Sequence, residues 1–482
     1  MQASIEELIY KKSLSNPTHR AAIDVSTGEV WSYCSLWDKI TKASSWYKEK
    51  GLKRGDRILL SASKDLGFLP AYFGAHLSGL ITVPIDPETN PDRLEMIIET
   101  ATPALIIGFL RHGEGKSLIG FDEIGKNTKT LSNIGFPDMN AISDILFTTG
   151  TTGKPKGVAL STLNESSAAE NINTFIGNTS DDIELVALPI SHSFGLGRIR
   201  CVLCKGGTLV LLGSFASMKR FYKAIEDYKI TGFGMVPASW AYISKMSGDR
   251  ISKYAGQIRY VEIGSAPMPH DEKIRLTRLL PETRICMHYG LTEASRSVFI
   301  NFQNDSGHLD TAGKAAPNVE IAIFSNSGER LQANIEGEVC VKGNHVCSDY
   351  WGMSEKDFRK DFFGKWFRTG DWGSLSEDGW LLLKGRNKEM INVGGKKVNP
   401  IEVEEKLLSY PGIVDCACIS SPDRVMGEVV KACIVESSST NDEEIKNYLS
   451  KLLENYKVPV VIERIGEIPR TSSGKIQRLK LK

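Results

Sequence analysis

Residues 145–158 combine the groups that a polyphosphate-binding loop needs. The apolar run Ile145–Phe147 ends abruptly in hydroxyls and glycines, and Lys154 and Lys156 follow with one proline between them. Glycines allow the backbone to turn several N–H groups toward one point, while hydroxyls add donors and ammonium groups add positive charge. We therefore expect a loop over 148–156 that wraps phosphates. The residues expected to contact the phosphates are Thr148, Thr149, Gly150, Thr151, Thr152, Gly153 and Lys156.

Two other interpretations of this loop compete with phosphate binding. Stretches rich in glycine and threonine are usually ordinary surface turns, although the strand-like lead-in and the lysines favour phosphate binding here. The common P-loop pattern G-x-x-x-x-G-K-[ST] is not met, because Thr148 stands where its first glycine is required and Pro155 where Ser or Thr is required. A kinase or GTPase of the P-loop type is therefore not expected.

The loop resembles the phosphate-binding signature of the adenylate-forming superfamily, which includes acyl-CoA synthetases, peptide-synthetase adenylation domains and luciferases. The usual signature has Ser where this chain has Thr149, a change that keeps the hydroxyl. Further segments match the superfamily's motifs in the expected order. They are Leu188–Gly195, Gly264–Pro267, His288–Glu293, Trp366–Asp371, Gly385–Glu389, Val393–Gly395, Gly427–Ala432 and Pro469–Lys475. The chain is identified as a member of the acyl-CoA synthetase branch of this superfamily.

The resemblance implies a nucleotide site that binds ATP and Mg²⁺. Glu293 would be the metal ligand, since a carboxylate is a hard oxygen ligand, and Thr292 would offer a catalytic hydroxyl to the α-phosphate. Tyr289 would present a flat face to adenine, and Asp371 would accept hydrogen bonds from the ribose hydroxyls. The residues implied at the ATP or AMP site, besides the loop, are Gly264, Ser265, Ala266, His288, Tyr289, Gly290, Asp371 and Arg386.

By the same resemblance, the end of the chain supplies the catalytic lysine. Lys475 lies in a segment rich in serine and glycine, and would bridge the carboxylate and the α-phosphate where charge develops in the adenylation transition state. The small C-terminal part would then rotate about the hinge residue Lys388. The rotation would remove Lys475 and bring in Gly394 and Gly395, which would line a tunnel for a pantetheine thiol because glycine permits close approach.

The sequence says less about the acid substrate. His192 matches the position where carboxylate and thiol enter in acyl-CoA synthetases, so we expect a catalytic role in gating or orienting the substrates. The alternative is a hydrogen-bonded core histidine. Phe194, Gly195 and Met235 are expected to line the acyl pocket and to leave room for an apolar tail or ring.

Two arginines, Arg198 and Arg200, follow the His192 motif. They could meet a second polar group of the acid, but we interpret them as solvent-facing helix positions. Amino-acid-activating members of the superfamily usually carry an aspartate near this region, and none occurs between residues 189 and 206, which disfavours an amino acid. The acceptor is expected to be CoA or the phosphopantetheine of an acyl carrier protein, since both present the same thiol.

Composition excludes some classes of protein. The net charge of +1, from 59 basic and 58 acidic residues, argues against nucleic-acid binding, which normally needs a basic excess. No run approaches 18 apolar residues and the N-terminus lacks a signal-peptide pattern, so we expect no membrane span and a cytoplasmic location. Cys201 and Cys204 have metal-ligand spacing without a matching second pair, so structural thiols are expected rather than a zinc site.

Alternation of β-rich and helical patterns predicts the fold. From about residue 50 onward it indicates an α/β protein with largely parallel βαβ units. The loops at 148, 189, 264 and 288 each follow a strand-like run. Ligands bind outside the carboxyl ends of strands in such sheets, so we expect these loops to meet at one crevice.

Residues 385–398 break this alternation, and a compact unit follows. Its expected elements are helices over 400–408 and 441–453 and strands over 413–419, 428–435 and 459–464. We expect a large N-terminal domain over 1–384 made mainly of parallel βαβ layers, a hinge over 385–392 and a small mobile α+β domain over 393–482.

The expected activity is ATP-dependent activation of a carboxylic acid through an acyl-AMP, with release of pyrophosphate, followed by transfer to a phosphopantetheine thiol. A ligase that loads an acyl or aminoacyl group onto a carrier protein, and a luciferase-like oxygenase, use the same scaffold. A catalytically silent nucleotide-binding regulator is a hypothesis from a different class. Lys475, Glu293 and Asp371 argue against it, because a regulator need not keep the catalytic set.

Overall fold

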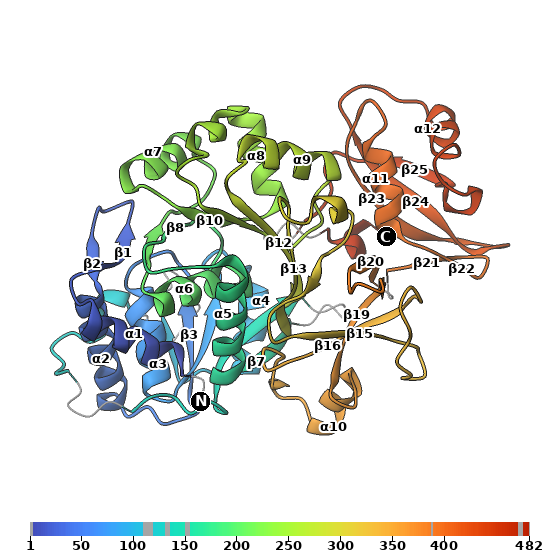
Figure 1. Cartoon of the computed structure of the whole chain (residues 1–482). Coiled ribbons are helices and arrows are strands. Elements are labelled where there is room, and N and C mark those ends of the chain that lie inside the picture. The colour runs from blue at the N-terminus through green and yellow to red at the C-terminus, as the bar shows by residue number, and fades with distance from the viewer. Residues whose placement is uncertain are drawn as a thin grey trace.

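The computed structural model describes residues 3–108, 119–130, 135–149, 155–386, 389–470 and 476–481. Figure 1 shows large sheets flanked by helices in the N-terminal part and a separate lobe at the C-terminal end. The predicted α/β fold, with a large N-terminal part and a small C-terminal α+β unit, is confirmed. Within the described ranges, no helix has the length and apolar character needed to cross a membrane.

A six-stranded sheet carries the phosphate-loop segment, in the order β17-β7-β6-β4-β3-β5. The strands β3 to β6 run parallel, whereas β6 and β7 form an antiparallel hairpin that brackets the expected phosphate loop. The strands are β3 (Arg57–Ser61), β4 (Ile81–Ile85), β5 (Leu105–Ile107), β6 (Ile142–Thr149), β7 (Pro155–Ser161) and β17 (Asp349–Tyr350). The helices beside it are α2 (Tyr33–Glu49), α3 (Phe68–Leu77), α4 (Pro91–Ala101) and α5 (Thr162–Ile176). Every residue of α3 is buried, as its apolar sequence requires.

A nine-stranded sheet has the order β14-β13-β12-β11-β10-β8-β9-β1-β2. Its centre is parallel, and the hairpins β12–β13 and β1–β2 are antiparallel. Its strands are β1 (Arg20–Asp24), β2 (Val30–Ser32), β8 (Ile183–Val186), β9 (Thr208–Leu211), β10 (Gly232–Met235), β11 (Tyr260–Ile263), β12 (Arg284–Leu291), β13 (Ala294–Asn301) and β14 (Lys314–Ala315). The helices are α1 (Ile5–Ser15), α6 (Ser193–Lys205), α7 (Met218–Tyr228), α8 (Pro237–Ser247) and α9 (His270–Leu279). The expectation of a loop at 288 is wrong, because residues 288–291 continue β12 and pair with β13.

Helices join the two sheets. α5 contacts both β7 and β13, and α6 contacts α5 as well as β8 and β9 (Figure 1). These two helices therefore form the layer between the sheets. The carboxyl end of β6 and the motif at His192, which directly precedes α6, depend on the same packed layer for their position.

Residues 320–386 form an antiparallel part of the N-terminal region, beside its mainly parallel layers. They form an antiparallel sheet in the order β15-β16-β19-β18, with β20 paired to β19. Burial alternates along β19, which is typical of a strand with one face on a core, and glycines at positive φ close the turns at 328, 364 and 379. The strands are β15 (Glu320–Phe324), β16 (Gly337–Lys342), β18 (Phe362–Phe363), β19 (Trp366–Leu375) and β20 (Leu381–Arg386), with α10 (Glu355–Phe358) beside them.

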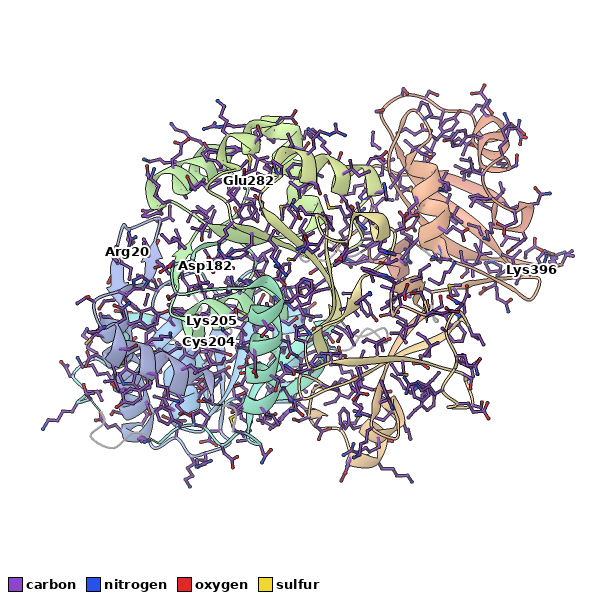
Figure 2. All side chains as sticks on the ribbon, viewed as in Figure 1. Arg20, Asp182, Cys204, Lys205, Glu282 and Lys396 are labelled. Atoms are coloured by element: carbon purple, nitrogen blue, oxygen red, sulfur yellow. The ribbon has the colours of Figure 1, made fainter. Side chains whose placement is uncertain are left out.

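The C-terminal unit has its own sheet and its own hydrophobic core. β21 (Ile391–Val393), β22 (Lys396–Val398), β24 (Gly427–Glu436) and β23 (Ile413–Asp423) are antiparallel neighbours, and β25 (Val461–Arg464) joins β24 in parallel. α11 (Pro400–Leu408) has the predicted bounds, whereas α12 (Asp442–Leu449) ends before the predicted residue 453. Figure 2 shows Lys396 at the outer end of the β21–β22 hairpin, away from the N-terminal body.

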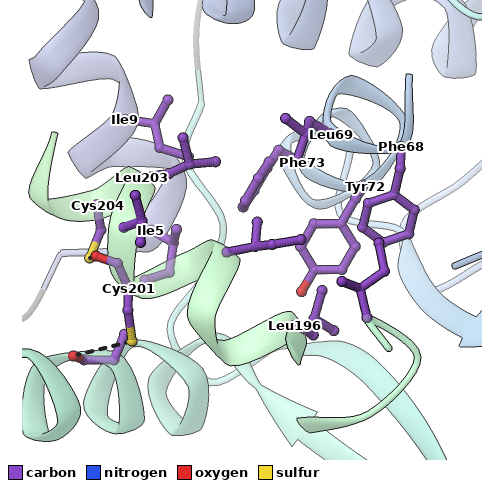
Figure 3. Close-up of a cluster of buried hydrophobic side chains, with 14 of the residues drawn as sticks. Ile5, Ile9, Phe68, Leu69, Tyr72, Phe73, Leu196, Cys201, Leu203 and Cys204 are labelled. Atoms are coloured by element: carbon purple, nitrogen blue, oxygen red, sulfur yellow. Dashed lines mark hydrogen bonds between the residues drawn. The ribbon is translucent and has the colours of Figure 1, made fainter. Parts of the chain in front are cut away.

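The largest hydrophobic core lies in the N-terminal part. Figure 3 shows side chains of α1, α3 and α6 packed together in it, among them Ile5, Phe73 and Leu203. Cys201 and Cys204 are buried there, and burial raises the pKa of the two thiols to about 11 and about 12. No group of three or more His, Cys, Asp or Glu residues suited to a metal ion occurs in the described ranges.

Candidate active site

The start of the phosphate-loop hairpin is well defined. Thr148 and Thr149 end β6, and the Thr148 hydroxyl donates to the carbonyl of Lys156 at 3.4 Å. The register pairs Thr148 with Lys156 and Thr149 with Pro155. The predicted loop residues 150–154 lie outside the described residues, as do Lys388 and Lys475.

Lys156 lies in a small cluster with two residues from distant segments. Its ammonium is 3.1 Å from the centroid of the Tyr350 ring and 3.5 Å from Oδ2 of Asp361. The hydroxyl of Tyr350 donates to Oε1 of Glu293 at 3.2 Å. Burial and the nearby Glu293 carboxylate raise the pKa of Tyr350, so the phenol keeps its proton. Tyr350 thus joins the predicted phosphate-binding lysine to the predicted metal ligand.

Tyr289 and Asp371, both predicted site residues, form a second contact. Tyr289 lies on β12 and its hydroxyl donates to Oδ2 of Asp371, on β19, at 2.6 Å. Asp371 is mostly buried, and its backbone N–H donates to the hydroxyl of Thr369. Arg386, at the end of β20, stands opposite Asp371 in the strand register. The two residues predicted to meet adenine and ribose are therefore neighbours in space.

The turn after β11 is shaped by the ring of His288. A Cβ on Gly264 would lie 2.1 Å from both Cε1 and Nε2 of that ring, so only glycine fits there. Ser265 follows with φ of 75°, a left-handed conformation that non-glycine residues rarely adopt. Such conformations persist only where the surroundings impose them, and they cluster at functional sites. The predicted residues Gly264, Ser265 and Ala266 thus form a sharply turned loop against β12.

A buried charge cluster underlies this turn. Glu262 lies 2.8 Å from Nδ1 of His288, 3.1 Å from Nε of Arg296 and 3.2 Å from Nη1 of Arg198. Arg296 also donates to the carbonyls of residues 193 and 194, at the start of α6. Burial opposes ionisation of Glu262, but the two arginines and His288 outweigh it and lower the pKa of the carboxyl. The cluster fixes β11, β12, β13 and α6 relative to one another.

A second buried network lies deeper in the molecule. Arg200 bonds to Asp144 and donates to Glu165 at 2.8 Å, and Tyr72 donates to Asp144 at 2.7 Å. His76 completes it, with Nε2 3.3 Å from Asp144 and Nδ1 2.9 Å from Glu6. Arg200 and His76 lower the pKa of Asp144 in spite of its burial, whereas burial raises the pKa of Glu165. Asp144 lies on β6, so this network supports the strand that leads to the predicted phosphate loop.

These networks correct the interpretation of Arg198 and Arg200 as solvent-facing. Both are buried, because α6 lies between the two sheets and leaves no face of the helix in water. A buried guanidinium requires carboxylate partners, and Glu184, Glu262, Asp144 and Glu165 supply them.

The residues predicted for the acyl pocket are packed in a core. Phe194 and Met235 are 6% and 1% exposed and belong to one hydrophobic cluster. A Cβ on Gly195 would lie 2.3 Å from the carbonyl oxygen of Pro189, so this glycine serves the packing of α6. A Cβ on Gly234 would lie 3.2 Å from the Phe194 ring, so Phe194 packs directly over β10, and the room for an apolar tail or ring at these residues stays a prediction. His192 is half-buried at the N-cap of α6.

Gly394 and Gly395, which follow the predicted hinge, adopt a backbone conformation that favours glycine. Gly394 and Gly395 have φ of 56° and 84°, and form the turn between β21 and β22. Gly394 donates its N–H to the carbonyl of Met426 at 2.9 Å, while a Cβ on Gly395 would meet no atom within 4 Å. A residue with a side chain at either position would strain the backbone.

Sequence reasoning missed Tyr350, Glu262 and Arg296. Glu262 had a usable signal, since a carboxylate inside the apolar strand run 260–263 must be paired when buried. Tyr350 and Arg296 had no such signal in the sequence, because their partners are far away in the chain.

Thr292 and Gly290 lie at the β12–β13 hairpin, where a Cβ on Gly290 would meet backbone atoms of β13.

Comparison with known proteins decides the family. The AMP-binding enzyme family matches residues 10–351, and the AMP-binding enzyme C-terminal domain matches residues 402–475. The chain belongs to the AMP-binding enzymes. The predicted membership of the acyl-CoA synthetase branch of adenylate-forming enzymes is confirmed.

Three curated relatives of this AMP-binding enzyme are CoA ligases. It is 29% identical over 465 residues to a feruloyl-CoA synthase of Amycolatopsis sp., covering 93% of each chain. It is 27% identical over 495 residues to the long-chain-fatty-acid–CoA ligase FadD13 of Mycobacterium tuberculosis, covering 98% of this chain and 97% of that protein. It is 28% identical over 490 residues to an oxalate–CoA ligase of Arabidopsis thaliana, covering 95% of this chain and 94% of that protein.

Solved structures share the fold of this AMP-binding enzyme. ATP-bound MatB from Rhodopseudomonas palustris superposes with a TM-score of 0.91 at 24% identity, covering 100% of this chain and 98% of that one. The o-succinylbenzoate CoA synthetase MenE from Bacillus subtilis, in complex with its acyl-adenylate intermediate, superposes with a TM-score of 0.90 at 24% identity. The match covers 98% of this chain and 97% of that one. At this identity the likeness concerns the fold alone.

Proposed function

We propose that this AMP-binding enzyme activates a carboxylic acid with ATP and transfers the acyl group to the thiol of CoA. In the first step, a carboxylate oxygen bonds to the α-phosphorus and the bond to pyrophosphate breaks. In the second step, the thiol sulfur bonds to the acyl carbon, the thiol loses its proton and AMP leaves. The observation that carries the proposal is the chain of contacts Lys156–Tyr350–Glu293.

That chain of contacts suits phosphates and a cation. Lys156 is held over the ring of Tyr350, at the foot of the predicted loop, where its charge can neutralise phosphate oxygens. Tyr350 donates to Oε1 of Glu293, and no bond to Oε2 is made within the described ranges, so Oε2 is a suitable ligand for Mg²⁺. Bound Mg²⁺ would reduce the charge of the phosphates. Thr292, next in the chain, would face the α-phosphate.

The residues proposed to bind the adenine and ribose of ATP are consistent with the same orientation of the nucleotide. The carboxylate of Asp371 receives the Tyr289 hydroxyl on one oxygen, and this bond turns it toward β12, where the adenine would lie. In this pose Asp371 would bind the ribose hydroxyls. Phosphates would then extend from Tyr289 past Glu293 to Lys156, because the first two residues belong to one hairpin.

The later steps involve residues near the C-terminus. Lys475 would stabilise the adenylation transition state, and the C-terminal domain would then turn about Lys388 to bring Gly394 and Gly395 to the site. His192 would orient the carboxylate and thiol where they enter. A ligase that loads a carrier protein uses the same chemistry, and the CoA ligases among the relatives favour CoA as the acceptor.

ATP–pyrophosphate exchange with a panel of carboxylic acids tests the proposal. Fatty acids of several lengths, benzoates, cinnamates, dicarboxylates and amino acids would be compared, and we expect exchange with one class. Lys475→Ala should abolish exchange but spare thioester formation from supplied acyl-adenylate, whereas exposed Lys365→Ala serves as a control. Equal loss of both half-reactions would contradict the two-conformation mechanism. Nucleotide binding without exchange for any acid would favour the regulator.

A further inference from the structure

The helices α7, α8 and α9 form an outer layer on the nine-stranded sheet. They cover the face of the sheet that is turned away from α5 and α6, and their inner sides share one hydrophobic core (Figure 1). The hydroxyl of Tyr222 on α7 is 2.7 Å from Oγ of Ser247 on α8. Arg275 on α9 donates to Oγ of Ser244 on α8 at 2.6 Å. The outer sides of the three helices therefore form one continuous surface.

This surface exposes large apolar side chains. Met246 is 56% exposed and Tyr242, one turn earlier on α8, is 36% exposed. Residues four apart share one face of a helix, so both side chains point outward together. Ile274, on the neighbouring helix α9, is 38% exposed. Exposed apolar groups rimmed by polar residues mark sites of interaction with proteins or membranes.

The same surface has an excess of positive charge. Residues 218–282 contain 11 basic and 7 acidic residues, although the net charge of the whole chain is only +1. Several carboxylates of this segment already have basic partners, in the pairs Lys223–Asp227, Arg250–Glu226, Arg275–Asp249 and Arg275–Glu272.

Exposed cations outnumber exposed acids among the residues that remain unpaired in this segment. The cations without an ion pair in the described ranges are Lys219, Arg220, Lys229, Lys245, Lys253 and Arg278, whereas the exposed acids without one are Asp271 and Glu282. An anionic partner would therefore find positive charge that the protein itself does not neutralise.

The headgroup region of a bilayer suits both properties of this surface. Apolar and aromatic side chains enter the boundary between headgroups and acyl chains, while lysine and arginine extend their charged ends to the headgroups. The unpaired cations are spread over α7, α8 and α9 on both sides of Met246, rather than gathered around one pocket. This arrangement suits a planar array of negative charges better than a single phosphate group.

We propose that the outer surface of α7, α8 and α9 docks this enzyme reversibly on bilayers that contain anionic lipids. The cations attract the headgroups, and Met246 enters the boundary with the acyl chains. Each lysine or arginine near an anionic bilayer strengthens binding about fivefold, and salt screens this attraction. The inference goes beyond the proposed function, because it concerns where the enzyme binds and not which reaction it performs.

Co-sedimentation with vesicles tests the inference. Vesicles of phosphatidylcholine alone would be compared with vesicles in which about a third of the lipid is phosphatidylglycerol, at about 0.05 M and about 0.5 M NaCl. We expect binding to the anionic vesicles at low salt, and much weaker binding at high salt or without the anionic lipid. The double variant Lys219→Gln, Arg220→Gln should bind about 25-fold more weakly.

Two further variants separate the contributions to binding. Met246→Ser removes apolar surface without changing the charge, and should weaken binding to the anionic vesicles about three- to tenfold. The double variant Lys126→Gln, Lys129→Gln makes the same change in charge on an exposed segment beside α2, at the other end of the N-terminal part, and should leave binding unchanged (Figure 1). Thermal unfolding of each variant checks that it is folded.

Three outcomes would overturn the inference. They are equal binding to both kinds of vesicle, unchanged binding of the Lys219→Gln, Arg220→Gln variant, and no binding to anionic vesicles, which would leave an acidic protein as the partner of this surface. Pyrophosphate exchange by the wild-type enzyme is measured separately. A lack of exchange with every acid would overturn the proposed function, whereas the result with vesicles would stand.

Discussion

The hydroxyl of Tyr289 donates a 2.6 Å hydrogen bond to Oδ2 of Asp371, a residue 82 positions away in the chain. This bond joins the nine-stranded sheet to the antiparallel sheet, at the edge of the proposed nucleotide site. It gives the carboxylate one orientation before a ribose arrives. Binding is tighter when such a group is already in place, because less conformational entropy is lost.

Tyr289→Phe should therefore weaken ATP binding. The variant keeps the ring for adenine but leaves Asp371 without the phenol, and loss of one hydrogen bond of about 1 kcal/mol corresponds to an increase of about fivefold in the KM for ATP. The KM of the acid should change little. Pyrophosphate exchange at varied ATP measures the effect, and Tyr242→Phe, whose exposed hydroxyl bonds to residue 216, is the matched control. An unchanged KM for ATP would show that the bond does not position Asp371.

Tyr350 permits its two contacts to be tested separately. Tyr350→Phe keeps the ring beneath Lys156 but removes the donor to Glu293, so the Mg²⁺ concentration for half-maximal exchange should rise several-fold. Tyr350→Leu also removes the ring and should raise the KM for ATP as well. Titrations of Mg²⁺ and ATP distinguish the two effects. Identical titrations for both variants would contradict separate roles for the ring and the hydroxyl.

Arg200 is predicted to be essential for stability rather than for chemistry. Arg200→Met leaves the carboxylates of Asp144 and Glu165 in the interior without their guanidinium, and breaking a buried pair in this way costs about 3–5 kcal/mol. Thermal or denaturant unfolding should show a large loss. Lys205→Met, on the exposed end of the same helix, should change stability by less than about 0.5 kcal/mol. Equal stability of the two variants would contradict this role of the network.

His76 should make stability depend on pH. Burial opposes its charge, but hydrogen bonds to Asp144 and Glu6 outweigh burial and raise the pKa of His76 from 6.5 to about 10. The folded protein therefore holds a proton that the unfolded chain releases, so this contribution is complete below about pH 6.5 and is lost as pH rises toward about 10. His76→Gln should be least stable relative to wild type at about pH 6.5 and below, and the difference in Tm should shrink as the pH rises toward about 10. A constant gap would contradict the assignment.

Much of the site could be predicted from the sequence because its motifs are local. The strand-to-hydroxyl transition before Thr148, the glycine turn at Gly264 and the hairpin that carries Glu293 each depend on residues close together in the chain. The bounds of α11 follow from apolar periodicity, and the structure reproduces them. The antiparallel sheet over 320–386 was not predicted, because the pairing of β16 with β19 joins segments that are far apart in the chain.

The sequence by itself therefore determined the family and the two-part α/β organisation, and it predicted which residue types face ATP, since these are properties of short motifs and local patterns. Tertiary structure alone decided which of these residues touch. It brought Tyr350 between Lys156 and Glu293, and it buried Arg198 and Arg200 between two sheets. Distant contacts depend on how layers pack, and packing is set by the whole hydrophobic core rather than by any one segment.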